Sequence, residues 1–138
     1  MNKIKLLKFI AKQKTAFISS IDEEGYPIIR AMLAPRIIEE NDIYFSTNTS
    51  SCKVKQYLNN NKACVYFYKR GLFKYQGVTI KGTMQVCTDL KTKQKVWKSL
   101  DKIFYKDGIN DIDYCVLKFT AIEAKYYKDF KIENIKFE

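Results

Sequence analysis

Apolar and polar residues alternate with a period of two along much of the chain, a pattern typical of half-buried β-strands. The longest alternating segment covers residues 75 to 86, and Gly82 interrupts its apolar face. We expect a β-bulge or a close approach of two backbones at this glycine. The apolar face consists of Val78, Ile80, Met84 and Val86.

Turn-forming residues divide the alternating segments into hairpins. Gly25 and Pro27 lie between one pair of segments, and the dipeptide Asn41-Asp42 separates the next pair. The predicted strands cover residues 15–22, 28–35, 36–40, 43–47, 63–69, 75–86, 113–127 and, more weakly, 130–137. Because antiparallel sheets remove their exposed edges by closing, the pattern predicts a mainly β (α+β) fold, an antiparallel, closed or partly closed barrel.

Three segments instead repeat their apolar residues every three or four positions, which predicts helices at the periphery of the barrel. They cover residues 3–13, a stretch from about residue 52 to the "NNNK" sequence, and residues 90–104, with Thr88 or Asp89 as the cap of the third. The residues expected on the buried faces are Ile4, Leu6, Leu7, Ile10 and Ala11 in the first helix, Val54, Tyr57 and Leu58 in the second, and Val96, Trp97, Leu100 and Ile103 in the third.

The length of 138 residues fits one domain over residues 1–138, with a core of its own. No apolar run approaches the roughly 20 residues that cross a bilayer, so we expect no membrane span. Lysines interrupt the N-terminal segment "MNKIKLLKFIAKQKTAF" every few positions, which is unlike a secretion signal. The sequence therefore predicts a cytoplasmic location.

The chain has no histidine, which removes the commonest zinc and iron ligand and the commonest general base. Ser-His and Cys-His nucleophile arrangements are excluded for the same reason. The four cysteines are far apart in the sequence and form no C-x-x-C pair. We expect reduced thiols, no metal site and little hydrolytic chemistry.

A net charge of +10 raises the possibility of a nucleic-acid partner. Only three of the 25 basic residues are arginines, however, and the lysines are dispersed over the whole chain. This distribution favours solvated lysines, and a nucleic-acid-binding domain is kept only as an alternative.

Two features of the sequence point to an anion site. Arg30 shares a strand face with apolar residues, where an unpaired cation needs a partner. The segment "STNTSSCK", residues 46–53, carries several hydroxyls into the start of a helix, where free backbone N–H groups and the helix dipole favour a phosphate. Two simpler interpretations stay open: Arg30 forms a salt bridge with Asp22 or Glu39 or snorkels to solvent, and Ser50 or Ser51 caps the helix.

Taken together, Arg30 and residues 46–53 resemble the phosphate-binding elements of the pyridoxamine 5'-phosphate oxidase-like, FMN-binding split barrels of the general stress protein 26 type. The resemblance extends over nearly the whole chain. It includes the first predicted hairpin, the strand "VTIKGTMQV" with its glycine, and Trp97 followed by the aromatic loop "IFYKDGINDIDYCVLKFTA".

The resemblance implies a homodimer with FMN at its interface. It places the phosphate on Arg30 and the hydroxyl-rich segment, and the isoalloxazine ring along residues 31–33. A flavin-contacting glutamine falls at Gln76, or one position later at Gly77. The predicted cofactor-binding residues are Arg30, Ala31, Met32, Leu33, Ser46, Thr47, Ser51, Lys53, Gln76 and Trp97.

The function implied by the resemblance is an oxidoreductase that passes electrons between a small-molecule donor and a small-molecule acceptor. The chain departs from the oxidases in having Cys52 and Pro35 at positions that are usually basic, and it lacks their C-terminal Arg-and-His element. Oxidation of vitamin B6 and haem degradation that uses a histidine ligand are therefore disfavoured. The main alternative is a stress-related module that binds flavin without turnover.

Overall fold

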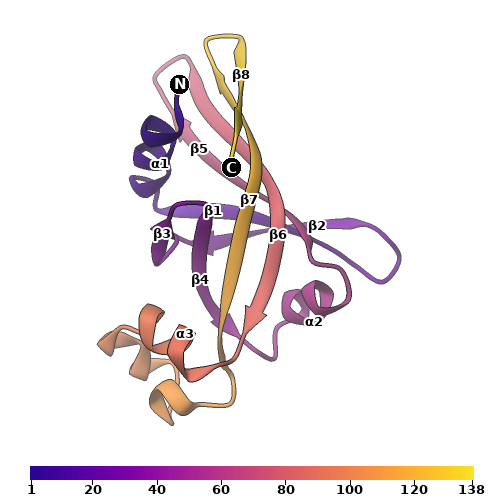
Figure 1. Ribbon diagram of the computed structural model, residues 1–138, viewed down its shortest axis with the longest axis vertical. Helices are drawn as coiled ribbons and strands as arrows, with labels where there is room; N and C mark the ends of the chain where they lie inside the picture. Colours follow the sequence, from indigo (N-terminus) through magenta and orange to yellow (C-terminus); the bar gives the residue numbers. More distant parts are fainter.

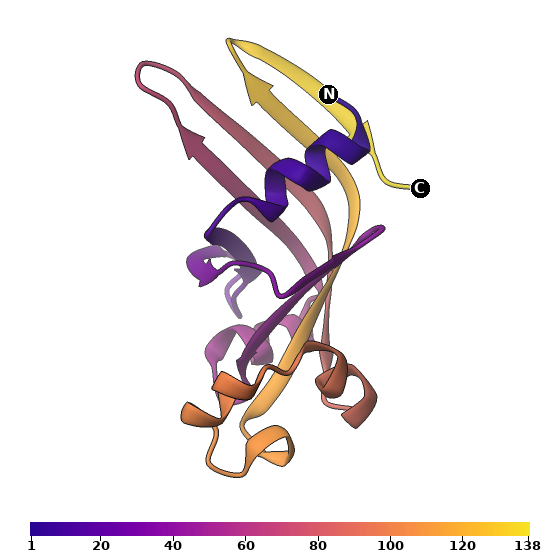
Figure 2. The same ribbon diagram turned by 90° about the vertical axis from the view of Figure 1, so that its left-hand side faces the viewer.

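Eight antiparallel strands curl into a split barrel in the computed structural model, which describes residues 1–138 (Figures 1 and 2). The sheet order is β2-β1-β5-β6-β7-β4-β3, with β8 paired to β7. Residues 34–36 connect the two edge strands, β2 and β3, directly. The strands are β1 (Thr15–Ile21), β2 (Pro27–Leu33), β3 (Ile37–Glu39), β4 (Asp42–Asn48), β5 (Lys62–Arg70), β6 (Tyr75–Cys87), β7 (Tyr114–Lys128) and β8 (Lys131–Lys136). The predicted mainly β fold and its hairpins are confirmed.

Three α-helices and two 3-10 helices surround the sheet. They are α1 (Lys3–Ala11), α2 (Cys52–Asn59), α3 (Leu90–Val96), η1 (Ser99–Ile103) and η2 (Gly108–Asn110). Figure 1 shows α3 and the 3-10 segments at one end of the barrel, far from the β7–β8 hairpin. None of the helices is both long and apolar enough to cross a membrane.

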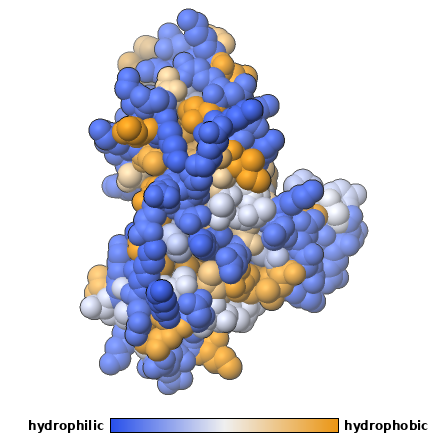
Figure 3. Space-filling model, viewed as in Figure 1, coloured by the Kyte–Doolittle hydropathy of each residue, from blue (hydrophilic) through white to orange (hydrophobic).

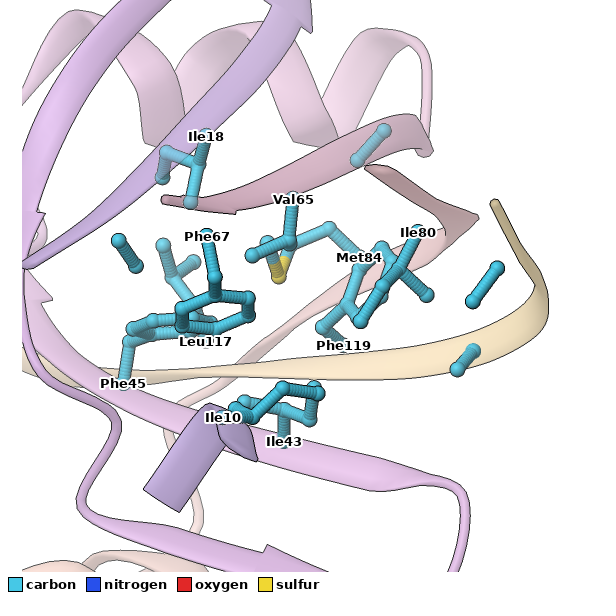
Figure 4. Close-up of a cluster of buried hydrophobic side chains, with 14 of the residues drawn as sticks. Ile10, Ile18, Ile43, Phe45, Val65, Phe67, Ile80, Met84, Leu117 and Phe119 are labelled. Carbon is cyan, nitrogen blue, oxygen red and sulfur yellow. The ribbon is translucent and has the colours of Figure 1, made fainter. Parts of the chain in front are cut away.

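The main core lies inside the barrel and contains 22 buried residues (Figure 4). It is built from the inward faces of the alternating strands, as expected from the sequence. In β6, Val78, Ile80 and Met84 are all at most 2% exposed. A smaller cluster beneath α3 includes Val96, Tyr105 and Tyr114.

Gly82 lies at the predicted irregularity in β6. The register of β6 against β7 shifts here, because Lys81 pairs with Glu123 whereas Gly82 pairs with Ala121. A Cβ atom on Gly82 would collide with the Thr120 carbonyl oxygen and with the Phe119 ring. The predictions of a bulge and of a close backbone approach are both confirmed, and both depend on the absence of a side chain.

The prediction of one helix over residues 90–104 was wrong. Helix α3 ends at Val96, and Trp97 has extended backbone angles, φ −59° and ψ 137°. The Asp101 carboxylate then accepts a 2.8 Å hydrogen bond from the Lys98 N–H, which begins the separate 3-10 helix η1. As a result Leu100 is 74% exposed and not buried.

Several predicted buried positions on the helices also lie at the surface. Ile4 and Ala11 of α1 are exposed, and Leu58 of α2 is 70% exposed. Each of these short helices buries only a narrow stripe of side chains, which in α1 is centred on Leu6 and Ile10.

Figure 3 shows apolar side chains at the surface of the largely hydrophilic molecule, including the end formed by α3 and the 3-10 segments. The exposed apolar residues of that end are Leu90, Leu100, Ile103, Phe104 and Ile112.

Candidate functional site

Arg30 points inward from β2 toward α2. Its guanidinium donates to the Ser20 hydroxyl over 2.9 Å and to Gln56 Oε1 over 3.2 Å. No carboxylate lies within ion-pairing distance of Arg30: Asp22 accepts hydrogen bonds from its own turn, and Glu39 pairs with Lys95. The salt bridges considered for Arg30 are therefore absent, and a half-buried cation has only neutral partners.

The start of α2 has hydroxyls without partners. Ser51 is the N-cap residue, but its side chain makes no capping hydrogen bond. Ser51 Oγ and Thr49 Oγ1 are both buried and have no nitrogen or oxygen hydrogen-bond partner, and the polar neighbour of the Thr49 hydroxyl is the Cys115 thiol, a weak partner. Buried hydroxyls are normally satisfied, because leaving one without a partner costs about 1–3 kcal/mol. The Ser50 and Ser51 side chains therefore do not cap α2.

Lys53 lies half-buried in the first turn of the same helix. Burial and the positive charge of Arg30 lower the pKa of the Lys53 ammonium. Both effects disfavour a second cation at this place unless an anion is present. Arg30, Lys53 and the hydroxyls of Thr49 and Ser51 are therefore a candidate anion site, called the anion site below.

A cleft of about 470 Å³ includes Thr47, which precedes the N-cap residue Ser51 by four positions, and Ala31, which follows Arg30 directly. The C-terminal end of β2 forms one side of the cleft, and the C-terminal half of β4 forms another. The cleft contains five of the residues singled out by the sequence analysis: Ala31, Met32, Leu33, Ser46 and Thr47. Ser46 Oγ also lies 3.3 Å from the Tyr114 hydroxyl.

The segment around η1 supplies a wall of the cleft that the sequence analysis missed. Asp101, Phe104 and Tyr105 line it, together with Arg36 and Asn48. Arg36 donates to both carboxylate oxygens of Asp101, over 2.5 and 2.9 Å, and the Tyr105 hydroxyl donates to Asn48 Oδ1 over 2.7 Å. These pairs are far apart in the sequence, so no local motif indicated them.

Ser20 and Gln56 were missed as well. Ser20 faces inward with Ala16 and Ile18 on β1, and an inward hydroxyl on an alternating strand is a signal that could have been used. Gln56 follows Lys53 by three positions, which puts both residues on one side of α2. Ser20 and Gln56 hydrogen-bond to each other and orient the guanidinium of Arg30.

Two predicted residues, Gln76 and Trp97, belong neither to the cleft nor to the anion site. Gln76 lies near the start of β6, where it accepts a 2.5 Å hydrogen bond from the Tyr126 hydroxyl. The β6 residue beside the cleft is Val86, ten positions later, because Val86 pairs with Leu117 and Leu117 pairs with Phe45 of the cleft. At roughly 3.3 Å per residue, this is a distance of roughly 30 Å. Trp97 packs on Tyr105, with 6.2 Å between the ring centroids. Tyr105 lines the cleft and Trp97 does not, so Trp97 contacts the cleft wall through Tyr105.

The arrangement fits a ligand with a phosphate and a planar ring. The anion site supplies two cations and two unpartnered hydroxyls for a phosphate. The cleft supplies the apolar end of β2, an aromatic wall and polar groups from β4.

Comparisons with known proteins show the family and the fold. The family model described as pyridoxamine 5'-phosphate oxidase like matches residues 2–137. A solved structure of a protein related to general stress protein 26 of B. subtilis (pyridoxinephosphate oxidase family), from Clostridium acetobutylicum, is 32% identical, with a TM-score of 0.82 over 96% of this chain and 92% of that one. No curated protein matches the chain.

More distant structures share the fold. General Stress Protein 26 from Bacillus anthracis str. Sterne is 22% identical, with a TM-score of 0.78 over 97% of each chain. A heme binding protein from Mycobacterium smegmatis is 9% identical, with a TM-score of 0.74 over 93% of this chain and 55% of that one. With the family model matching almost every residue, the chain belongs to the pyridoxamine 5'-phosphate oxidase-like family.

Proposed function

We propose that this protein is a flavoprotein that binds FMN and transfers electrons between a small-molecule donor and a small-molecule acceptor. The single observation that carries the proposal is the anion site at the start of α2. Arg30 there has no carboxylate partner, and two buried hydroxyls have no nitrogen or oxygen partner. A phosphate would satisfy these groups at once, with charge-assisted hydrogen bonds.

The isoalloxazine ring would lie in the adjoining cleft, against the backbone of residues 31–33 and the aromatic wall of Phe104 and Tyr105. Bound FMN would supply the redox chemistry, whereas the protein would position the ring and set its electrostatic environment. Haem fits less well, because the chain has no histidine to ligate the iron.

A homodimer is part of the proposal. The outer face of β2 carries Ile29 and Leu33, which are 71% and 81% exposed. Ile29 borders an apolar hollow of about 600 Å³ on β1, β5 and β6, whereas Leu33 borders the flavin cleft. A second copy that covered this apolar face would therefore also approach the ring.

The side chains of the cleft offer no free acid or base. Asp101 is held by Arg36, and the Tyr105 hydroxyl is held by Asn48. Burial raises the pKa of Tyr105 to about 12, so its hydroxyl stays protonated at neutral pH. This observation favours either chemistry by the flavin alone or a flavin-binding module without turnover. Rapid reduction of the bound flavin by NADH or NADPH would support the oxidoreductase, and its absence with all such donors would support the module.

Flavin titration tests the proposal directly. The purified protein, saturated with FMN, should show the absorbance bands of a bound flavin, and riboflavin should bind much more weakly because it lacks the phosphate. Each charged hydrogen bond to that group should contribute about 1.5–3 kcal/mol. Equal affinity for the two flavins would refute the anion site. Binding of nucleic acid with steep salt dependence, and no binding of flavin, would favour the basic nucleic-acid-binding alternative.

A further inference from the structure

The Arg36–Asp101 pair is unusual among the ion pairs of this protein. The Asp101 carboxylate is the most deeply buried acidic side chain of these pairs, at 5% exposure, and it binds Arg36 through both oxygens. Burial acts to raise the pKa of Asp101, but hydrogen bonds from Arg36 and from the Lys98 N–H outweigh it, and the pKa lies below its usual value. Asp101 is therefore ionised at neutral pH, and the guanidinium is held in one orientation.

Arg36 lies on the wall of the flavin cleft. It follows Arg30 by six residues, which span at most roughly 20 Å of backbone, because β2 ends at Leu33 and residues 34–36 connect it to β3. A guanidinium has five N–H donors. Two of the Arg36 donors bind Asp101, so the others are free for an acceptor inside the cleft.

We propose that Arg36 binds the polar carbonyl edge of the isoalloxazine ring and that Asp101 is the positioning residue that aims its guanidinium there. The inference rests on the proposed function and assigns a residue to the ring, whereas Arg30 is assigned to the phosphate. A fixed cation beside this edge stabilises the ring more after reduction, when the ring carries negative charge, than before. Arg36 thus sets both the affinity for the ring and the reduction potential of the bound flavin.

A purely structural ion pair would behave differently. Such a pair would only fasten η1 to the connection between β2 and β3, and its removal would lower stability without changing flavin binding by the folded protein. The two roles are separated by comparing FMN with riboflavin. A residue that contacts the ring changes both affinities by the same factor, whereas a residue that contacts the phosphate changes only the affinity for FMN.

The test uses Arg36→Met, Asp101→Asn and the double variant, titrated with FMN and with riboflavin. Each single change should weaken both flavins equally, on the order of 10- to 100-fold for Arg36→Met. The double variant should be no worse than Arg36→Met alone, because Asp101 acts through Arg36. The reduction potential of bound FMN should become more negative in Arg36→Met, and Arg36→Lys, which keeps the charge, should recover part of this shift.

Lys95→Met is the matched control, because it also removes an ion pair, the exposed one between Lys95 and Glu39. Neither of these two residues lines the cleft. It should change neither affinity nor potential. Unchanged affinity for both flavins in a folded Arg36→Met protein would overturn the inference while leaving the proposed function intact. Loss of FMN binding alone, with riboflavin binding retained, would also overturn it, because Arg36 would then act on the phosphate. Failure of the unaltered protein to bind either flavin would instead refute the proposed function, and this inference with it.

Discussion

The Arg30 guanidinium donates a hydrogen bond to the Ser20 hydroxyl over 2.9 Å, and this neutral contact takes the place that a salt bridge would normally occupy. Gln56 is its second neutral acceptor. A cation held by neutral groups keeps its full charge available for a ligand. The predictions below follow from this arrangement and from the groups around it.

Arg30→Ala should weaken FMN binding by about 2–4 kcal/mol, because a partly buried phosphate loses its fixed cation. Riboflavin binding should stay unchanged. The stability of the flavin-free protein should change little, since no carboxylate is left without a partner. Fluorescence titration and denaturant unfolding measure the two quantities. Arg70→Ala, at the exposed end of β5, is the control. A large loss of stability with FMN affinity intact would show that Arg30 is structural.

Ser51→Ala should separate ligand binding from helix capping. The Ser51 hydroxyl is buried without a partner, so its removal should leave the flavin-free protein as stable as before, or slightly more stable. FMN affinity should fall by about 1–3 kcal/mol. The matched control is Asp89→Ala, because Asp89 does cap its helix by accepting from the Thr92 N–H. That change should lower stability and leave FMN affinity alone. If Ser51→Ala instead lowered stability and left FMN affinity unchanged, Ser51 would have a capping role.

Lys53 should make FMN binding depend on pH. Burial and Arg30 lower the pKa of Lys53 below its usual 10.5 in the free protein, and a bound phosphate would raise it again. Binding therefore takes up a proton in the interval between the two values, and the affinity for FMN relative to riboflavin should fall as pH rises through it. The stability of the flavin-free protein should rise over the part of this interval below 10.5, because the unfolded chain binds more protons there.

Lys53→Met should flatten that pH dependence and should cost on the order of 1 kcal/mol of FMN affinity near neutral pH. Added salt should reduce this cost more than it reduces the cost of Arg30→Ala, because Lys53 is a flexible single charge. A pH profile for FMN relative to riboflavin that is the same in both proteins would exclude Lys53 from the phosphate site.

Ile29→Lys should disrupt the proposed homodimer. Light scattering of the unaltered protein should report a dimer whose thermal stability rises with FMN. A lysine in the middle of the apolar outer face should shift the monomer–dimer equilibrium toward the monomer and weaken FMN binding. Ile132→Lys is the control, because Ile132 is similarly exposed, at 66%, on the distant strand β8. A strictly monomeric unaltered protein that binds FMN tightly would refute the dimeric site.

The sequence by itself determined the strands, their inward faces and the hairpins. Alternation and turn residues are local properties, and each depends on neighbours within a few positions. Gly82 was predictable for the same reason, since one missing side chain in an apolar face has few explanations. The order of these local features was also enough for the resemblance to the family, which the match over residues 2–137 confirms.

The tertiary structure alone decided which polar groups meet. The break after Val96 has no local signal, because apolar residues continue at helical spacing to Ile103. The break depends on Asp101, whose partner Arg36 lies 65 positions away. Likewise, capping was an open local explanation for the Ser51 hydroxyl until the geometry left it without a partner. Local sequence fixes which face of a strand or helix a side chain occupies, whereas its partner depends on how the whole sheet closes, because the pairing energy arises only after the chain has brought distant segments together.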